Sequence, residues 1–209
     1  MTNNPLTLYH YWRSSCSWRV RWALEIKKVP YRSIAINLLK NEQNSAEYLK
    51  KNPLGFVPAL DTGKVILGES LAILEWIEEK FPSPALLPSN PDERAIVRQL
   101  ALIIIAGTQP MQNLSVQKYY TTDEKKRLED GRYFIRKGLS GFEKLVKNTH
   151  GEFAFKNSLT FADLSLIPQC YNAERFDMNL SEFPIIEMIY RKCRALPSCV
   201  ASEPVNPVE

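Results

Sequence analysis

The sequence predicts two domains of different classes, an α/β domain over residues 1–82 and an all-α domain over residues 91–209. Strand-like and helix-like segments alternate in the first part, a proline-rich linker occupies 83–90, and the later segments have the apolar spacing of helices. A chain of 209 residues is long enough for one large or two small domains with real cores.

The first domain is expected to have the element order βαβαββα. LTLYHY at 6–11 and YRSIAIN at 31–37 have the composition of strands, and SWRVRWALEIKK at 17–28 has helical spacing. The remaining expected elements are a short helix, the two strands of a hairpin and a final helix, at 45–52, 57–60, 64–68 and 69–81. This order is that of a thioredoxin-like domain.

Helices alone are expected in the second domain. They are predicted over about 91–106, 123–146, 160–176 and 183–196. Asn90 can cap the first of them, and Thr160 with Asp163 has the spacing of a capping box before the third. Gly107 and Pro110 are expected to interrupt the end of the first helix.

Composition excludes several classes of protein. The hydrophobic content of 44% and the charged content of 24% are ordinary for a globular chain. The net charge of +4 is mild and its basic residues are scattered, which disfavours nucleic-acid binding and leaves small anions as partners. The longest apolar run, LALIIIA at 100–106, is too short to span a bilayer, and no secretory signal is visible.

The cysteines indicate neither a disulfide framework nor a metal site. Cys16, Cys170, Cys193 and Cys199 form no CxxC pair and have no zinc spacing, and the chain has only two histidines. No metal is therefore expected, and reduced thiols in the cytoplasm are the simplest interpretation.

The stretch WRSSCSWRVR at 12–21 lies where a thioredoxin-like domain would carry a redox-active cysteine pair. Ser14, Ser15 and Cys16 occupy the start of the helix, and Trp18 stands where a second cysteine would be, so disulfide exchange by a CxxC pair is excluded. A helix N-terminus rich in hydroxyl groups stabilises an anion. From the residues alone, the serines either act on such an anion or cap the helix.

Four large side chains in this stretch have plainer expected roles. Trp12 and Trp18 are expected to pack as apolar groups. Arg19 and Arg21 are expected to form ion pairs at the surface or between domains, with attraction of anions into a cleft as the alternative. Because pockets favour domain interfaces, a ligand site is expected between the two domains.

Six motifs together carry a family resemblance. They are SSCSWRVRWAL, NPLGFVPAL, GESLAILEWIEEKFP, QPMQNLSV, LTFADLSLIPQ and NAERF. With these motifs the chain resembles the zeta class of glutathione transferases over about residues 6–196. The first motif is specific to that class, whereas the TFAD helix start is shared more widely among glutathione transferases. The resemblance implies the glutathione transferase fold, with glutathione as the cofactor.

The resemblance implies that the thiol of glutathione lies at the start of the first helix. Ser14 is the first choice for the hydroxyl that donates a hydrogen bond to the thiolate, Ser15 is next, and Cys16 is a neighbour that tunes the site. The pKa of a cysteine thiol is roughly 8.5 when free and falls to roughly 3.5–7.5 at helix N-termini or beside cations. This position therefore favours the reactive thiolate.

The remaining contacts of glutathione are implied in the same way. The backbone of Val57, before a cis Pro58, would bind the cysteinyl part as an added strand does. Ser70 would meet the γ-glutamyl carboxylate at a helix start, and Glu69 would pair with its amino group. Further glutathione contacts are implied at Gln43, Gln109, Asn113 and Ser115. For the last three, the residues alone also fit a kinked helix whose amides satisfy freed backbone groups.

The implied second ligand is a small dicarboxylate. Arg13, beside the serines, and Arg175, in NAERF, would hold its carboxylates, because a guanidinium binds a carboxylate through two hydrogen bonds. The implied reaction is the glutathione-dependent cis–trans isomerisation of maleylacetoacetate to fumarylacetoacetate in tyrosine and phenylalanine breakdown, by a cytoplasmic homodimer. The alternatives are isomerisation of maleylpyruvate, general glutathione transfer or dehalogenation of α-haloacids, and a binding protein without activity.

Overall fold

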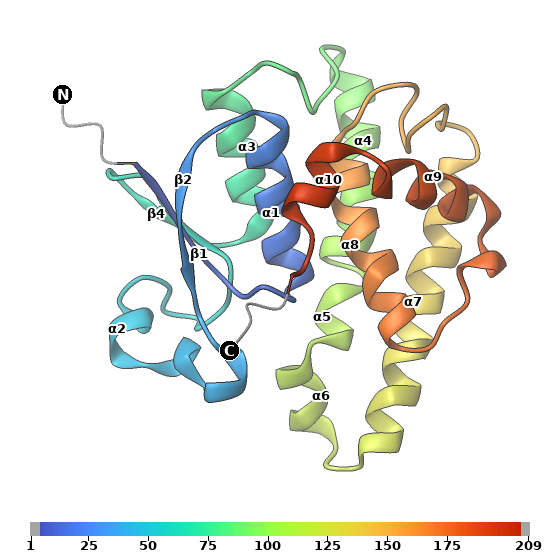
Figure 1. Ribbon diagram of the computed structural model, residues 1–209. Helices are drawn as coiled ribbons and strands as arrows, with labels where there is room; N and C mark the ends of the chain where they lie inside the picture. Colours follow the sequence, from blue (N-terminus) through green and yellow to red (C-terminus); the bar gives the residue numbers. More distant parts are fainter. Residues whose placement is uncertain (1–4, 206–209) are drawn as a thin grey trace. The chain divides into compact units, whose positions relative to one another are not determined.

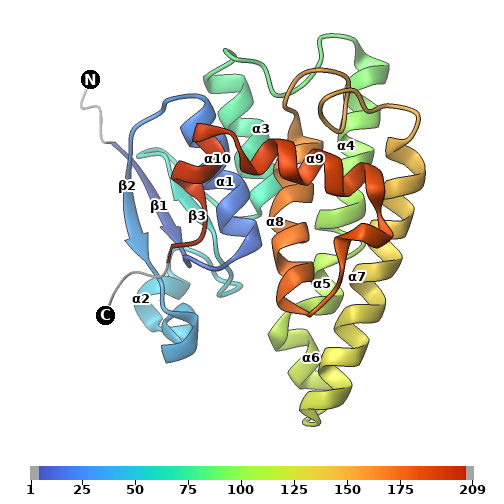
Figure 2. The same ribbon diagram turned by 45° about the vertical axis from the view of Figure 1, so that its right-hand side comes forward.

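The computed structural model describes residues 5–205 and divides the chain into two compact units. The first unit runs up to Pro84 and also contains the segment from Pro197 onwards, and the second unit is Ala85–Leu196. The sequence assigned the segment after Leu196 to the helical domain. In the structure this segment packs with the first unit, as helix α10 (Pro197–Ser202) against helix α1 (Ser15–Ile26) (Figures 1 and 2).

Hydrogen bonds from α1 hold α10 in place. The indole N–H groups of Trp18 and Trp22 donate to the hydroxyls of Ser202 and Ser198, each over 3.1 Å. Arg21 Nε donates to the backbone carbonyl of Ser202 over 3.0 Å. Both tryptophans are fully buried, so the expected apolar packing of Trp18 is confirmed and is joined by a specific hydrogen bond.

The first unit contains a four-stranded mixed sheet with the order β2-β1-β3-β4. The strands are β1 (Leu6–His10), β2 (Tyr31–Ala35), β3 (Ala59–Asp61) and β4 (Ile66–Leu67). β1 pairs with β2 in parallel, and the β1–β3 and β3–β4 pairs are antiparallel. The expected thioredoxin-like βαβαββα order is confirmed.

Helices α1 and α3 (Ser70–Lys80) pack against each other on one face of this sheet (Figure 1). Fully buried apolar side chains from the sheet and both helices form the core, among them Leu8, Val20, Leu24, Leu60, Ile73 and Leu74. Lys27 and Glu78 form a buried ion pair of 2.5 Å between the two helices. The short helix α2 (Ala46–Leu49) follows two single turns of 3₁₀ helix.

The described part of the second unit is helical apart from its connections and one 3₁₀ turn (Leu180–Glu182). Its helices are α4 (Pro91–Ile105), α5 (Gln109–Gln112), α6 (Leu114–Tyr120), α7 (Glu124–Val146), α8 (Phe161–Arg175) and α9 (Pro184–Arg194). α4 packs on α7 and α8, and α9 on α7 and α8. The predicted interruption is confirmed, since α4 ends at Ile105 and Pro110 lies in the first turn of α5.

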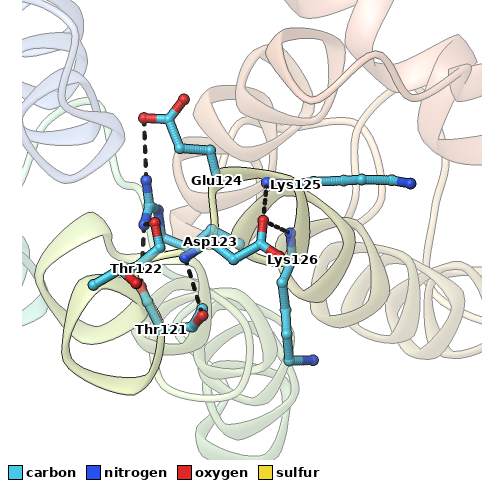
Figure 3. A network of polar contacts seen from close by, with 7 residues as sticks. Thr121, Thr122, Asp123, Glu124, Lys125 and Lys126 are labelled. Atoms are coloured by element: carbon cyan, nitrogen blue, oxygen red, sulfur yellow. Dashed lines mark hydrogen bonds and ion pairs between the residues drawn. The ribbon is translucent and has the colours of Figure 1, made fainter.

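Side-chain caps fix where the long helices begin. Asn90 Oδ1 accepts hydrogen bonds from the N–H groups of Asp92 and Glu93, and the Thr160–Asp163 capping box is present, as predicted. Figure 3 shows the start of α7, where Asp123 Oδ1 accepts from the backbone N–H groups of Lys125 and Lys126. No helix among residues 5–205 has both the length and the apolar character needed to cross a bilayer.

A glycine allows α5 and α7 to approach each other closely. A Cβ atom at Gly138 in α7 would lie 1.9 Å from Thr108 Oγ1, at the start of α5. Thr108 is fully buried and donates its hydroxyl to the carbonyl of Ile103 over 2.8 Å. Only a residue without a side chain fits at position 138, so this glycine sets the distance between the broken helix and α7.

Candidate active site

Ser14 is the N-cap of α1. Its backbone is extended, and its hydroxyl oxygen accepts a hydrogen bond from the N–H of Ser17 over 3.2 Å. Since that bond uses a lone pair, the hydroxyl hydrogen of Ser14 can still be donated to a ligand. The two interpretations left open by the sequence are therefore compatible, because one hydroxyl can cap the helix and bind an anion.

Ser15 and Cys16 are the first two residues of α1, and both are half-buried. The first N–H groups of a helix have no partner within the helix and carry the positive end of its dipole. Cys16 forms no disulfide, and its side chain interacts with the guanidinium of Arg19. The start of α1 therefore combines hydroxyls, a thiol and backbone donors.

Arg19 is not a surface residue, so the expected ion pair at the surface is wrong. Its side chain is fully buried, and Nη1 donates to the hydroxyl of Ser70 over 2.7 Å. The reason is that α1 is covered on two sides, by the sheet with α3 and by α10, so residues 17–24 are all buried. Burial lowers the pKa of Arg19, while its interactions with Cys16 and Glu69 raise it.

Arg21 is also buried, with 7% of its surface exposed, so the same expectation is wrong there. Its Nη2 donates to the carbonyl of Trp12 over 3.0 Å, and Nη1 lies 3.2 Å from Nδ1 of His10. Burial lowers the pKa of His10 to about 4, so the imidazole is neutral at pH 7. An arginine only donates, so Nδ1 accepts and Nε2 donates to Ser33 Oγ over 2.6 Å. Arg21 thus ties α10 to the turn that leads into Ser14.

The start of α3 is the second candidate anion site in the first unit. Ser70 is the first helical residue and is buried, whereas the side chain of the N-cap Glu69 is exposed. Glu69 has φ 55° and ψ 110°, a conformation that costs on the order of 1–3 kcal/mol for a residue with a side chain. Such outliers cluster where a site needs a particular backbone geometry.

The Val57-Pro58 peptide bond is cis. The antiparallel register, with Tyr9 opposite Ala59, brings these residues beside the end of β1, where the chain turns towards Ser14. Gln43 lies close to the loop that leads to Val57, because a Cβ atom placed on Gly55 would be 3.0 Å from the backbone carbonyl oxygen of Gln43. The side-chain Oε1 of Gln43 is buried and accepts no hydrogen bond from the described residues, so it can accept one from a ligand.

The candidates of the second unit lie on the broken helix and at the end of α8. Gln109 begins α5 and is buried. Asn113 caps α6, where its Oδ1 accepts from the N–H and the hydroxyl of Ser115 over 3.2 and 3.1 Å. Arg175 is the last residue of α8, is exposed, and donates to Asn172 Oδ1 over 3.0 Å. In the first unit, the guanidinium of Arg13 lies over the ring of Trp12.

One polar pair was missed by sequence reasoning. The side-chain amides of Gln112 and Gln169 exchange two hydrogen bonds, of 2.7 and 3.0 Å. Gln169 is fully buried within α8. The available signal was Gln169 itself, a polar residue on a helix predicted to be apolar. Its partner, Gln112, lies 57 positions earlier in the sequence, and no local spacing predicts a pair that far apart.

Comparison with known proteins identifies both halves of the chain. Residues 4–79 match a family model described as glutathione S-transferase, N-terminal domain, and residues 110–201 match glutathione S-transferase, C-terminal domain. The chain is 44% identical to maleylacetoacetate isomerase of Dictyostelium discoideum, over 99% of this chain and 96% of that protein.

Solved structures give the same result. A maleyl pyruvate isomerase, described as a bacterial zeta-class glutathione S-transferase in its holo form, superposes with a TM-score of 0.92 and 36% identity, over 95% of this chain and 96% of that one. A maleylacetoacetate isomerase of Anaeromyxobacter dehalogenans with bound glutathione has a TM-score of 0.86 and 41% identity, over 96% and 95% of the two chains.

Proposed function

Since this chain belongs to the glutathione S-transferase family, we propose that it works as a zeta-class enzyme on the site at the start of α1. It is a glutathione-dependent cis–trans isomerase that converts maleylacetoacetate to fumarylacetoacetate. The observation that carries this function is the Ser14 hydroxyl, which caps α1 and keeps its hydrogen for an anion beside the thiol of Cys16.

The residues of the first unit fit glutathione. The helix starts at Ser14 and Ser70 suit a thiolate and a carboxylate, the exposed carboxylate of Glu69 suits an ammonium group, and the buried Oε1 of Gln43 suits a peptide N–H. The backbone before cis Pro58 is our candidate for the cysteinyl part. When bound, glutathione would supply a thiolate for reversible addition to the cis double bond, so that this bond could rotate as a single bond before the thiolate leaves and the trans double bond forms.

The chain's own residues have three tasks in this reaction. Ser14 donates a hydrogen bond that holds the sulfur in its ionised form, and Ser15 and Cys16 shape the same helix start. Arg13 and Arg175 hold carboxylates of the substrate by charge-assisted hydrogen bonds while its central bond turns. Gln109, Asn113 and Ser115 are further candidates for glutathione contacts.

The test is isomerisation of maleylacetoacetate with and without glutathione, beside maleylpyruvate at the same concentration. We expect turnover of maleylacetoacetate that requires glutathione and does not consume it. A strong preference for maleylpyruvate would keep the chemistry and change the substrate. Net consumption of glutathione with electrophiles or α-haloacids, and no isomerisation, would indicate a general transferase. Binding of glutathione without any turnover would indicate a binding protein.

Replacing Glu69 by glutamine tests the proposed contact with the γ-glutamyl amino group. The substitution removes a charge and keeps the shape, so we expect KM for glutathione to rise about tenfold, with kcat within about twofold of the wild type. Steady-state kinetics at varied glutathione concentration measure this. A matched control is Glu79→Gln, an exposed glutamate near the other end of α3, which should leave KM unchanged.

Replacing Arg175 by alanine tests the proposed contact with a substrate carboxylate. Loss of a charge-assisted pair should raise KM for maleylacetoacetate by about ten- to a hundredfold, with KM for glutathione unchanged. Arg191→Ala removes another exposed arginine, which pairs with Glu187 on α9, and serves as the control. An equal rise of both KM values would argue against a role confined to the substrate.

We also propose a homodimer that works in the cytoplasm as part of tyrosine and phenylalanine breakdown. The exposed side chains of Ile96 and Leu102 on α4 support a surface covered by a partner, and four cysteines outside disulfides suit a reducing compartment. Sedimentation of the purified protein tests the dimer.

A further inference from the structure

We propose that Arg19 is a positioning residue that fixes both ends of the glutathione site, through Cys16 at the start of α1 and Ser70 at the start of α3. This inference rests on the proposed function, since it assigns a role within the glutathione site. We assign Arg19 no contact with the substrate or the reacting atoms. It acts through the two helix starts that do.

The geometry places one cation behind two helix N-termini. Arg19 Nη1 donates to Ser70 Oγ over 2.7 Å, and the charge of the same guanidinium interacts with Cys16, the second residue of α1. Its charge also interacts with Glu69, the N-cap of α3. α1 and α3 pack against each other, so the guanidinium links them at the ends that carry the candidate ligand groups.

A charged arginine at position 19 is energetically unfavourable for two reasons. Its side chain is fully buried, and burial opposes the charged form. It also lies in the second turn of α1, close to the positive end of the helix dipole, where a cation is disfavoured. An apolar side chain of similar volume would fill the space between α1 and α3 without these two penalties. Departures of this kind are expected where function requires them.

The hydrogen bond to Ser70 determines what that hydroxyl can do. An arginine only donates, so Ser70 Oγ accepts from Nη1 and its own hydrogen remains for a ligand carboxylate. A hydroxyl held in this way is already oriented before the ligand arrives, which lowers the entropy lost on binding. Loss of the bond should therefore weaken glutathione binding at its γ-glutamyl end.

The positive charge of Arg19 acts at the start of α1. A cation in a poorly solvated interior interacts more strongly with a nearby anion than it would in water. Arg19 interacts with Cys16, two residues after the Ser14 hydroxyl that we propose holds the thiolate. The charge should favour the ionised form of the bound thiol.

The test compares neutral and charged replacements of Arg19. The neutral variants are Arg19→Met and Arg19→Gln, and Arg19→Lys keeps the charge without the planar fork. The readout is the pKa of the thiol of bound glutathione, followed by the ultraviolet absorbance of the thiolate against pH. We expect the neutral variants to raise this pKa by about one unit, which is a tenfold loss of thiolate at neutral pH, and Arg19→Lys to keep the wild-type value.

The lysine variant also tests the link to Ser70. Because an ammonium cannot reproduce the fork, KM for glutathione should rise about fivefold in Arg19→Lys while kcat is retained. If the neutral variants do not fold, the kinetics of Arg19→Lys alone test the inference. A wild-type KM for glutathione in Arg19→Lys then overturns it. The control is Lys27→Met, which removes a buried cation near the other end of α1. It should lower stability and leave the thiol pKa unchanged.

The outcomes separate this inference from the proposed function. If the wild type binds no glutathione, the proposed function fails. If the wild type binds it and the neutral variants keep the wild-type thiol pKa, Arg19 is only a structural link between α1 and α3, and the inference alone fails. A shift of the same size in Lys27→Met would also overturn it, because that effect would follow from lost stability.

Discussion

Replacing Ser14 by alanine is expected to lower kcat/KM for isomerisation by roughly 10²- to 10³-fold, the usual effect of removing one donor to a developing or bound anion. The hydroxyl oxygen already accepts from the N–H of Ser17, so its hydrogen points away from that N–H and can be donated to a ligand. Without it, the bound thiol loses a hydrogen bond that favours its ionised form. Steady-state kinetics and the pH dependence of the bound thiol measure the loss.

The same substitution removes a helix cap, which costs about 1 kcal/mol of stability by itself. Asn90→Ala removes the cap of α4 and serves as a control, since it should cost similar stability without loss of rate. Ser14→Thr keeps both a hydroxyl and a cap and should recover most of the rate. Full activity in Ser14→Ala would move the donor role to Ser15 or to Cys16.

Local signals predicted much of the fold because their causes are local. The capping groups at Asn90 and Thr160 and the helix break between Ile105 and Pro110 depend on residues within a few positions, and all are confirmed. α10 was missed because the six residues PSCVAS are too few for a helical period, and their place depends on hydrogen bonds from Trp18 and Trp22, far away in the sequence.

The errors at Arg19 and Arg21 have one physical origin. Periodicity reports a single apolar face, but α1 is covered on two sides, so its arginines were assigned to a surface that does not exist there. The positive φ of Glu69 has no sequence signal, because glutamate does not favour that conformation. The helix cap at Ser14, by contrast, could be predicted, because serine is a preferred N-cap residue.

The largest expected effect on stability is at Asp163. This carboxylate is fully buried at the start of α8. Its Oδ1 accepts from the N–H of Ala154 over 2.8 Å, and its Oδ2 accepts from the N–H and the hydroxyl of Thr160 over 2.9 and 3.1 Å. Asp163→Ala leaves these three donors buried without an acceptor, so we expect a loss of about 3–5 kcal/mol in the free energy of unfolding. Chemical denaturation of the two proteins at pH 7 measures it.

The same residue should give the stability a specific pH dependence. Burial raises the pKa of Asp163 from 3.8 to about 6, against the hydrogen bonds that lower it. Between these two values the folded chain binds more protons than the unfolded chain, so the free energy of unfolding falls as the pH rises, by up to about 3 kcal/mol. Asp163→Asn has no proton to lose at this position and should lack this component. The difference in unfolding free energy between wild type and Asp163→Asn should therefore shrink from pH 4 to pH 6 and stay constant above pH 6. If the two curves of unfolding free energy against pH are parallel instead, Asp163 is ionised throughout this range.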